Sequence, residues 1–192
     1  MSVGKELFEQ DLKLALAAAA SAYRRRRFVV VGSAAILATF PDAPSFLRLS
    51  ADIDMFPIRK LDTTDFQSGD EQVGQASAFE VEHDFYIERL GDWTMLSQPK
   101  GWFERCVKYS TEGKIDGKDV MVDGYALQPL DLAYNKLEAG RDKDLNFVGG
   151  LIAEGLIALE DLEQFIKDGC PHEELLPGIM KSLDLIKKAL DA

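Results

Sequence analysis

Hydrophobic and polar residues alternate most regularly in the segment from Arg48 to Met55. The apolar positions are Leu49, Ala51, Ile53 and Met55, and the polar positions are Arg48, Ser50, Asp52 and Asp54. A period of two predicts a β-strand whose apolar side chains enter the core while its polar side chains face a cleft. Asp52 and Asp54 would then lie on one face of the strand, about 7 Å apart.

An apolar run at residues 28–31 precedes this segment and predicts a buried strand, because it is rich in β-branched residues. Gly32 bounds the run, and we expect a helix to begin at Ser33 and to end before the Pro-Asp-Ala-Pro sequence at 41–44. Gly32 would permit a close approach of the backbone to a ligand, and the start of the helix would offer free N–H groups to an anion.

The rest of the pattern predicts an α+β fold. We expect a helix at 5–25, a polar segment at 62–75 with a loop around 68–70 and a short helix after it, and a strand at 79–90. Shorter strands are expected at 93–96, 106–109 and 120–126, with turns at 112–113 and 116–117, and helices at 130–139, 143–152, 159–167 and 172–190. Because strands come first and helices last, we expect a mixed sheet with flanking helices in residues 1–128 and a C-terminal helical region, 129–192, packed on that core.

The composition is typical of a globular protein: 46% of the 192 residues are hydrophobic and 29% are charged. No signal peptide is visible and no apolar run approaches the length of a membrane span, so we expect a cytoplasmic protein without a membrane partner. The two cysteines, Cys106 and Cys170, are far apart and are expected to stay reduced. With His83 and His172 they match no familiar zinc-site spacing.

The net charge of −11 argues against a broad nucleic-acid-binding face, which is usually basic. The exception is the run of four arginines, Arg24 to Arg27, at the end of the first expected helix. These cations could simply stabilise the negative end of the helix dipole. Alternatively, they form a basic edge near the cleft that meets phosphate. The sequence favours neither interpretation.

The acid pair suggests a metal site. Two carboxylates this close repel each other, and a divalent cation such as Mg²⁺, which prefers oxygen ligands, removes the penalty. Taken alone, an Asp-x-Asp pair is more often a solvated strand face. Its position after a strand and a Gly-Ser turn favours the metal site.

A second group of charged residues lies where the helical part begins. Gly140 fits the C-cap of one helix and Asp142 the N-cap of the next, so Lys136 and Arg141 would lie near a helix–helix corner. Both cations could then reach into one cleft and neutralise triphosphate oxygens. The alternative is a charged helix surface with i,i+4 ion pairs.

The chain resembles the minimal nucleotidyltransferases of the DNA polymerase-beta superfamily, and in particular the bacterial group related to AbiEii-type and MenT-type toxins. The resemblance lies in Gly32-Ser33, in Arg48 with Asp52-Ile53-Asp54, in His-Asp-Phe-Tyr-Ile-Glu at 83–88, in Gly-Trp-Phe-Glu-Arg at 101–105 and in the segment 131–144. Together these segments extend over roughly residues 28 to 148. The resemblance implies a polymerase-beta-like fold.

The resemblance also implies the roles of the site residues. Asp52 and Asp54 would be catalytic and bind Mg²⁺ or Mn²⁺, Gly32 and Ser33 would position the triphosphate of an NTP, and Lys136 and Arg141 would support nucleotide binding, with Asp144 holding one of them in place. The third acid is expected at Glu88, although Glu80, Glu82 and Asp84 share its face if the whole segment is a strand.

Two features depart from the family pattern. Eighteen residues separate Ser33 from Asp52, which implies a longer intervening loop, and Glu88 is longer than the usual aspartate. Either could mark a member that binds nucleotide without transferring it.

Two functions are therefore expected. The first is a metal-dependent enzyme that moves a nucleoside monophosphate from an NTP to a hydroxyl of RNA, with tRNA suspected, or of protein, and acts as a toxin of a toxin–antitoxin pair. The second is a catalytically weak nucleotide-binding or partner-binding module that docks a protein such as an antitoxin.

Overall fold

The structure, a computed structural model, describes residues 4–58, 63–91 and 95–191. The chain forms two compact units. The sheet unit comprises Met1–Asp92 and Cys106–Leu127, and the helical unit comprises Trp93–Arg105 and Gln128–Ala192. The boundary expected from the sequence, at residue 128, places Trp93–Arg105 with the core. In the structure this segment belongs to the helical unit.

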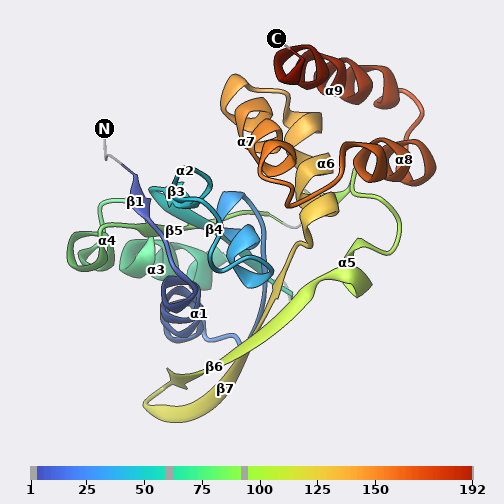
Figure 1. Cartoon of the computed structure of the whole chain (residues 1–192). Coiled ribbons are helices and arrows are strands. Elements are labelled where there is room, and N and C mark those ends of the chain that lie inside the picture. The colour runs from blue at the N-terminus through green and yellow to red at the C-terminus, as the bar shows by residue number, and fades with distance from the viewer. Residues whose placement is uncertain (1–3, 59–62, 92–94, 192) are drawn as a thin grey trace. The chain divides into compact units, whose positions relative to one another are not determined.

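The sheet unit is built on a five-stranded mixed sheet in the order β5-β4-β2-β7-β6 (Figure 1). Its strands are β2 (Arg27–Val30), β4 (Asp52–Pro57), β5 (Tyr86–Arg89), β6 (Val107–Ile115) and β7 (Lys118–Ala126). The central strand β2 is antiparallel to β4 and parallel to β7, while β4 and β5 are parallel and β6 and β7 form a hairpin. The predicted α+β class with a mixed sheet and flanking helices is confirmed.

Helices α1 (Glu9–Tyr23) and α3 (Thr63–Val73) pack on one face of this sheet, and α1 lies along the β6–β7 hairpin (Figure 1). The strands bury the side chains Phe28, Val30, Ile53, Met55 and Ile87. At the helix–sheet contact, the hydroxyl of Tyr23 donates a hydrogen bond to Asp70 at 2.7 Å, and Arg89 donates to the same carboxylate. This contact fixes α3 to both α1 and β5.

Shorter elements complete the sheet unit. These are the two-stranded sheet of β1 (Lys5–Glu6) and β3 (Leu49–Ser50), the 3-10 helix η1 (Ser33–Ala38), and helices α2 (Ser45–Arg48) and α4 (Ala78–His83).

The helical unit contains α5 (Trp102–Arg105), α6 (Pro129–Ala139), α7 (Asp142–Ala153), α8 (Leu159–Gly169) and α9 (Leu176–Leu190). Its core is made of leucine, isoleucine and other apolar side chains from α6 to α9, among them Leu132, Leu137, Leu151, Leu162 and Leu183. Glu163 on α8 accepts hydrogen bonds from Lys167 and from Lys187 of α9. None of the helices in the described part of the chain has the length and apolarity that a bilayer crossing requires.

Three predicted elements are wrong in the sheet unit. Residues 78–83 form the helix α4 instead of the first half of a strand, and residues 63–73 form one continuous helix through the loop expected at 68–70. Strand β6 continues through the turn expected at 112–113. Of the two expected turns, the structure has the one at 116–117, which joins β6 to β7.

Smaller differences concern boundaries. Helix α1 begins at Glu9 rather than residue 5, and Leu49, expected in the core, is 54% exposed. Helix α9 begins at Leu176, four residues after the predicted start. The short strand expected at 93–96 lies partly outside the described residues, and Met95 and Leu96 are not in a strand.

Candidate metal and nucleotide site

The carboxylates of Asp52, Asp54 and Glu88 form one group in the sheet unit. Strands β4 and β5 are parallel neighbours, and their register pairs Asp54 with Glu88 and Asp52 with Tyr86. Paired residues point to the same face of a sheet, so all four side chains share one face. One oxygen from each of the three carboxylates lies within 4.8 Å of the other two. Asp52 and Asp54 are half-buried and Glu88 is exposed.

The structure separates Glu88 from the other acids expected on its strand. Glu80 and Glu82 belong to helix α4, and Asp84 is the left-handed C-cap of that helix, with φ of 62°. Among the described residues, only Glu88 joins the two aspartates in such a group.

The alternation of β4 holds the two aspartates in place. Ile53 and Met55 are fully buried on the opposite face, as predicted. The hydroxyl of Ser50 donates a hydrogen bond to Asp52 at 2.8 Å and restrains that carboxylate further. The acids are therefore presented by a rigid strand rather than by a loop.

Gly32 is in direct contact with this group. The N–H of Val31 donates to the carbonyl of Asp54 at 2.9 Å, which places the end of β2 against the acid strand. Gly32 has φ of +65°, and a Cβ at this position would lie 1.9 Å from Oδ2 of Asp54. Only glycine fits here while Asp54 keeps its position. The Gly-Ser turn and the acid pair are thus parts of one arrangement.

Ser33 begins the helix expected after Gly32, but this helix is a six-residue 3-10 helix. A helix this short supplies only a small macrodipole. The close approach of the Asp54 side chain to the Gly32 backbone is therefore the stronger feature of this turn.

Tyr86 belongs to the same face and was missed in the sequence. Burial first, and then the negative charges of Asp52, Glu88 and Asp54, raise the pKa of Tyr86 to about 12. Its hydroxyl therefore stays protonated and can donate a hydrogen bond near the acids. The alternation that identified Glu88 also contains Tyr86 and would have indicated it.

Lys136, Arg141 and Asp144 form a second group, which lies within the helical unit. The ammonium of Lys136 on α6 lies 2.9 Å from Oδ1 of Asp144 on α7, and Nε of Arg141 lies 2.5 Å from Oδ2. Asp144 is fully buried and Lys136 is 8% exposed, whereas the Arg141 side chain is 61% exposed. Asp144 therefore positions both cations, one inside the unit and one at its surface.

The electrostatics of this second group agree with its geometry. Burial is the largest single influence on Asp144 and raises its pKa, but the hydrogen bonds and charges of Arg141 and Lys136 together outweigh it. The net pKa of Asp144 lies below its ordinary value, so the ion pair forms at neutral pH. Gly140 is the C-cap of α6, as predicted, whereas the N-cap of α7 is Arg141 and not Asp142.

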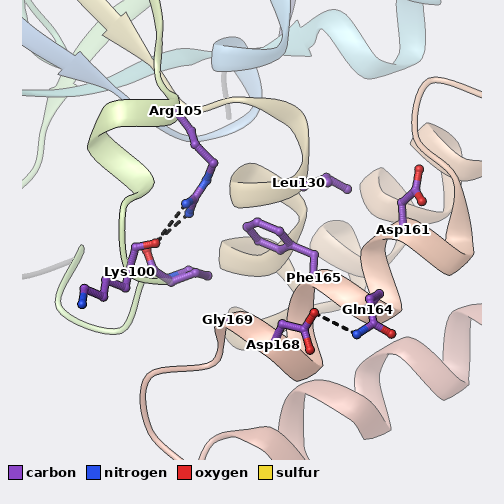
Figure 2. Close-up of a pocket in the computed structure, with 9 residues that line it drawn as sticks. Lys100, Arg105, Leu130, Asp161, Gln164, Phe165, Asp168 and Gly169 are labelled. Atoms are coloured by element: carbon purple, nitrogen blue, oxygen red, sulfur yellow. Dashed lines mark hydrogen bonds between the residues drawn. The ribbon is translucent and has the colours of Figure 1, made fainter.

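A pocket of about 420 Å³ also lies within the helical unit (Figure 2). It is lined by Pro99, Lys100, Arg105, Leu130, Asp161, Gln164, Phe165, Asp168 and Gly169. Arg105 donates to both oxygens of the buried Asp131 and to the carbonyl of Lys100, and its guanidinium lies 5.2 Å from the centre of the Phe165 ring. These contacts give Arg105 a structural role, because they fasten the segment before the hairpin to α6.

The acid group in the sheet unit fits a divalent cation. Three carboxylates supply only hard oxygen donors at a spacing that one ion can bridge, and Mg²⁺ and Mn²⁺ prefer such ligands. An ion there would also offset the repulsion among the three acids.

Comparisons with known proteins give one result that identifies the family. Neither a curated protein nor a solved structure matches the chain significantly. Residues 5–174 match the family described as "Nucleotidyltransferase of unknown function (DUF6036)". This match extends over most of both units, and the chain therefore belongs to this family of nucleotidyltransferases.

Proposed function

We propose that the protein is a metal-dependent nucleotidyltransferase that moves a nucleoside monophosphate from an NTP to a hydroxyl of RNA or protein. The observation that carries the proposal is the grouping of Asp52, Asp54 and Glu88 against Gly32. The acceptor oxygen would form a bond to the α-phosphorus, the bond to the bridging oxygen would break, and pyrophosphate would leave with the β- and γ-phosphates. The hydroxyl proton would pass to solvent.

In this proposal the sheet unit supplies the metal ligands. Asp52, Asp54 and Glu88 would hold Mg²⁺ or Mn²⁺. A divalent cation bound there would neutralise triphosphate charge and increase the acidity of the acceptor hydroxyl. Gly32 lets the Asp54 carboxylate lie against the backbone of the turn, and Gly32 and Ser33 would position the triphosphate beside it. The hydroxyl of Tyr86 offers a neutral donor on the same face.

The helical unit would supply cations for the triphosphate. Arg141 is the better candidate for direct phosphate contact, because its side chain is largely exposed. The buried Lys136 would contribute its charge, and Asp144 would keep both cations in position.

The resemblance to AbiEii-type and MenT-type toxins extends the proposal to a toxin of a toxin–antitoxin pair, with tRNA as the suspected acceptor and an antitoxin as protein partner. We place this activity in the cytoplasm, where NTPs and tRNA occur together.

The experiment incubates the pure full-length chain with each α-labelled NTP, with Mg²⁺ or Mn²⁺, and with total tRNA. We expect label in RNA or in the protein itself. Glu88→Gln should lower the rate of transfer at least a hundredfold, whereas Glu82→Gln, which changes an exposed acid on α4, should leave it within twofold. Equal rates for the two variants would remove Glu88 from the mechanism.

A second candidate is a catalytically weak module that binds nucleotide or a protein partner. The feature that favours it is Glu88, which is exposed and has a longer side chain than aspartate, so that it restrains a metal less well. Saturable NTP binding in calorimetry, without label transfer to any acceptor, would support this module instead of the enzyme.

A further inference from the structure

The face of the sheet that carries the three acids continues across three more strands. The register pairs Val30 of β2 with Met55, so Val29 and Arg27 lie on the same face as Asp54. The next pairings place Asp123 and Tyr125 of β7, and then Ser110 and Lys108 of β6, on this face as well. The opposite face is the one that α1 and α3 cover.

Tyr125 lies between two cations on this face. The guanidinium of Arg27 lies 5.3 Å from the centre of the Tyr125 ring and donates to its hydroxyl at 3.3 Å. The ammonium of Lys108 lies 5.9 Å from the same ring centre. Tyr125 is half-buried and the Lys108 side chain is 54% exposed, so both cations and the ring are accessible.

Two cations lie against this tyrosine, although the chain as a whole carries −11. Arg27 belongs to the run of four arginines, and α1 ends at Tyr23, before all of them. Asp123 pairs with Lys108 at 3.0 Å, while Arg24 pairs with Asp116 at 3.3 Å. Arg27 and Lys108 against Asp123 leave a net positive charge beside Tyr125 that attracts phosphate.

This surface is close to the metal ligands. Tyr125 lies two strands away from Asp54, about 10 Å across the sheet, and about two residues along the strand direction, so the two Cα atoms are about 12 Å apart. Val29 and Phe56 lie between the two positions on this face and are buried, so the accessible part of the face is the one around Tyr125.

We propose that this surface, formed by Arg27, Lys108 and Tyr125, binds single-stranded nucleic acid. A phosphate lies between the two cations, and a ribose or base packs on the Tyr125 ring. Accessible aromatic rings beside cations on a sheet are how sequence-tolerant single-strand binding is commonly built. The inference rests on the proposed function in one respect, because the bound strand would carry the acceptor hydroxyl.

The test is fluorescence anisotropy of a labelled mixed-sequence single-stranded oligoribonucleotide, titrated with the full-length chain without NTP. The double variant Arg27→Ala/Lys108→Ala should bind about tenfold more weakly, and the slope of log K against log salt should fall by about 0.7, because one phosphate contact is lost. Tyr125→Ala should also weaken binding about tenfold, while Tyr125→Phe, which keeps the ring, should retain it.

Lys13→Ala is the matched control. Lys13 is 44% exposed and paired with Glu9, much as Lys108 is paired with Asp123, but it lies on α1 on the other side of the sheet. The Lys13→Ala variant should bind the oligonucleotide with the affinity of the wild type. Unchanged binding by the double variant, or an equal loss in Lys13→Ala, would overturn the proposal.

Two further measurements distinguish failure of the nucleic-acid proposal from failure of the proposed function. A poly-glutamate peptide of matched charge should not compete; if it competes as well as the oligonucleotide, the surface binds acidic chains in general and the nucleic-acid proposal is wrong. Asp52→Asn should bind the oligonucleotide normally but transfer nothing. Binding through this surface without any transfer in the wild type would contradict the proposed function and leave the surface supported.

Discussion

Two groups of aspartates, one in each unit, have opposite surroundings. In the helical unit, Asp131 and Asp144 are fully buried; Asp131 is paired with one cation of the unit, Arg105, and Asp144 with two, at hydrogen-bond distance. In the sheet unit, Asp52 and Asp54 are only half-buried and are grouped with another acid. A buried carboxylate with a protein cation stabilises the fold that surrounds it. Three acids grouped on two neighbouring strands repel one another, and such a grouping is typical of functional sites rather than of structural ones.

The largest effect should come from Asp54→Asn. We expect transfer activity to fall about a thousandfold or more, because one of the three proposed metal ligands and its charge are lost. Thermal stability should stay the same or rise slightly, since repulsion among the acids decreases. Label transfer and a melting curve measure the two quantities. If Asp54→Asn were strongly destabilised, Asp54 would have a structural role like that of Asp131 and Asp144, and the difference between the two groups of acids would not hold.

Asp144→Asn should lower stability, in contrast to Asp54→Asn, which should lower activity. Removing the charge leaves Lys136 in a buried site without its carboxylate, which should lower the free energy of unfolding by about 3 kcal/mol. Urea unfolding measures this loss. Asp142→Asn, two residues away and exposed, should change stability by less than about 0.5 kcal/mol.

The same ion pair predicts a pH dependence. The pKa of Asp144 is lowered below its ordinary value of 3.8 in the folded protein. Its contribution is therefore complete above pH 3.8 and is lost as the pH falls through the folded-state pKa. Urea unfolding at a series of pH values should show a steeper acid loss for the wild type than for Asp144→Asn. Parallel curves would contradict the role of this pair.

Gly32→Ala should lower the free energy of unfolding by about 2 kcal/mol, because the new Cβ meets Asp54 and φ is positive. Gly117→Ala is the control: its φ is +75°, but nothing lies within 4 Å of the added Cβ. It should cost only about 1 kcal/mol of backbone strain. An equal cost at both positions would show that the contact with Asp54 relaxes freely.

The smallest effect concerns the metal itself. Mn²⁺ at ten times its dissociation constant should stabilise the wild type by about 1.4 kcal/mol, measured as a rise in melting temperature. Asp52→Asn should lose most of this rise, whereas Asp144→Asn should keep it. A rise that survives in Asp52→Asn would place the metal elsewhere.

The sequence predicted the elements whose pattern is unambiguous. The strict alternation around Ile53 identified the acid strand and its two faces, and Gly140 marked the end of α6. Residues 78–83 were misjudged because apolar and polar residues happen to alternate there. A helix signal was present, since Ser77 is followed three residues later by Glu80, and Ser77 does cap α4 by accepting from the Glu80 N–H.

The residues of the candidate site could be predicted from the sequence only in part, and for a different reason. Asp52, Asp54 and Gly32 lie close enough in the sequence to suggest one another. The partnership of Glu88 with Asp54 depends on which strands are neighbours and in what register, and no local pattern specifies this. The alignment of Arg27, Tyr125 and Lys108 has the same origin, because it joins three strands from distant parts of the chain.

Strand β5 occupies the edge of the five-stranded sheet, and it carries one of the three acids. Edge strands have a ladder on one side only and separate from a sheet more readily than central strands do. Separation of the four residues of β5 from β4 would remove Glu88 from the group of three acids while β4 keeps its pairing with β2. The integrity of the candidate site therefore depends on a single strand-to-strand ladder at the border of the sheet.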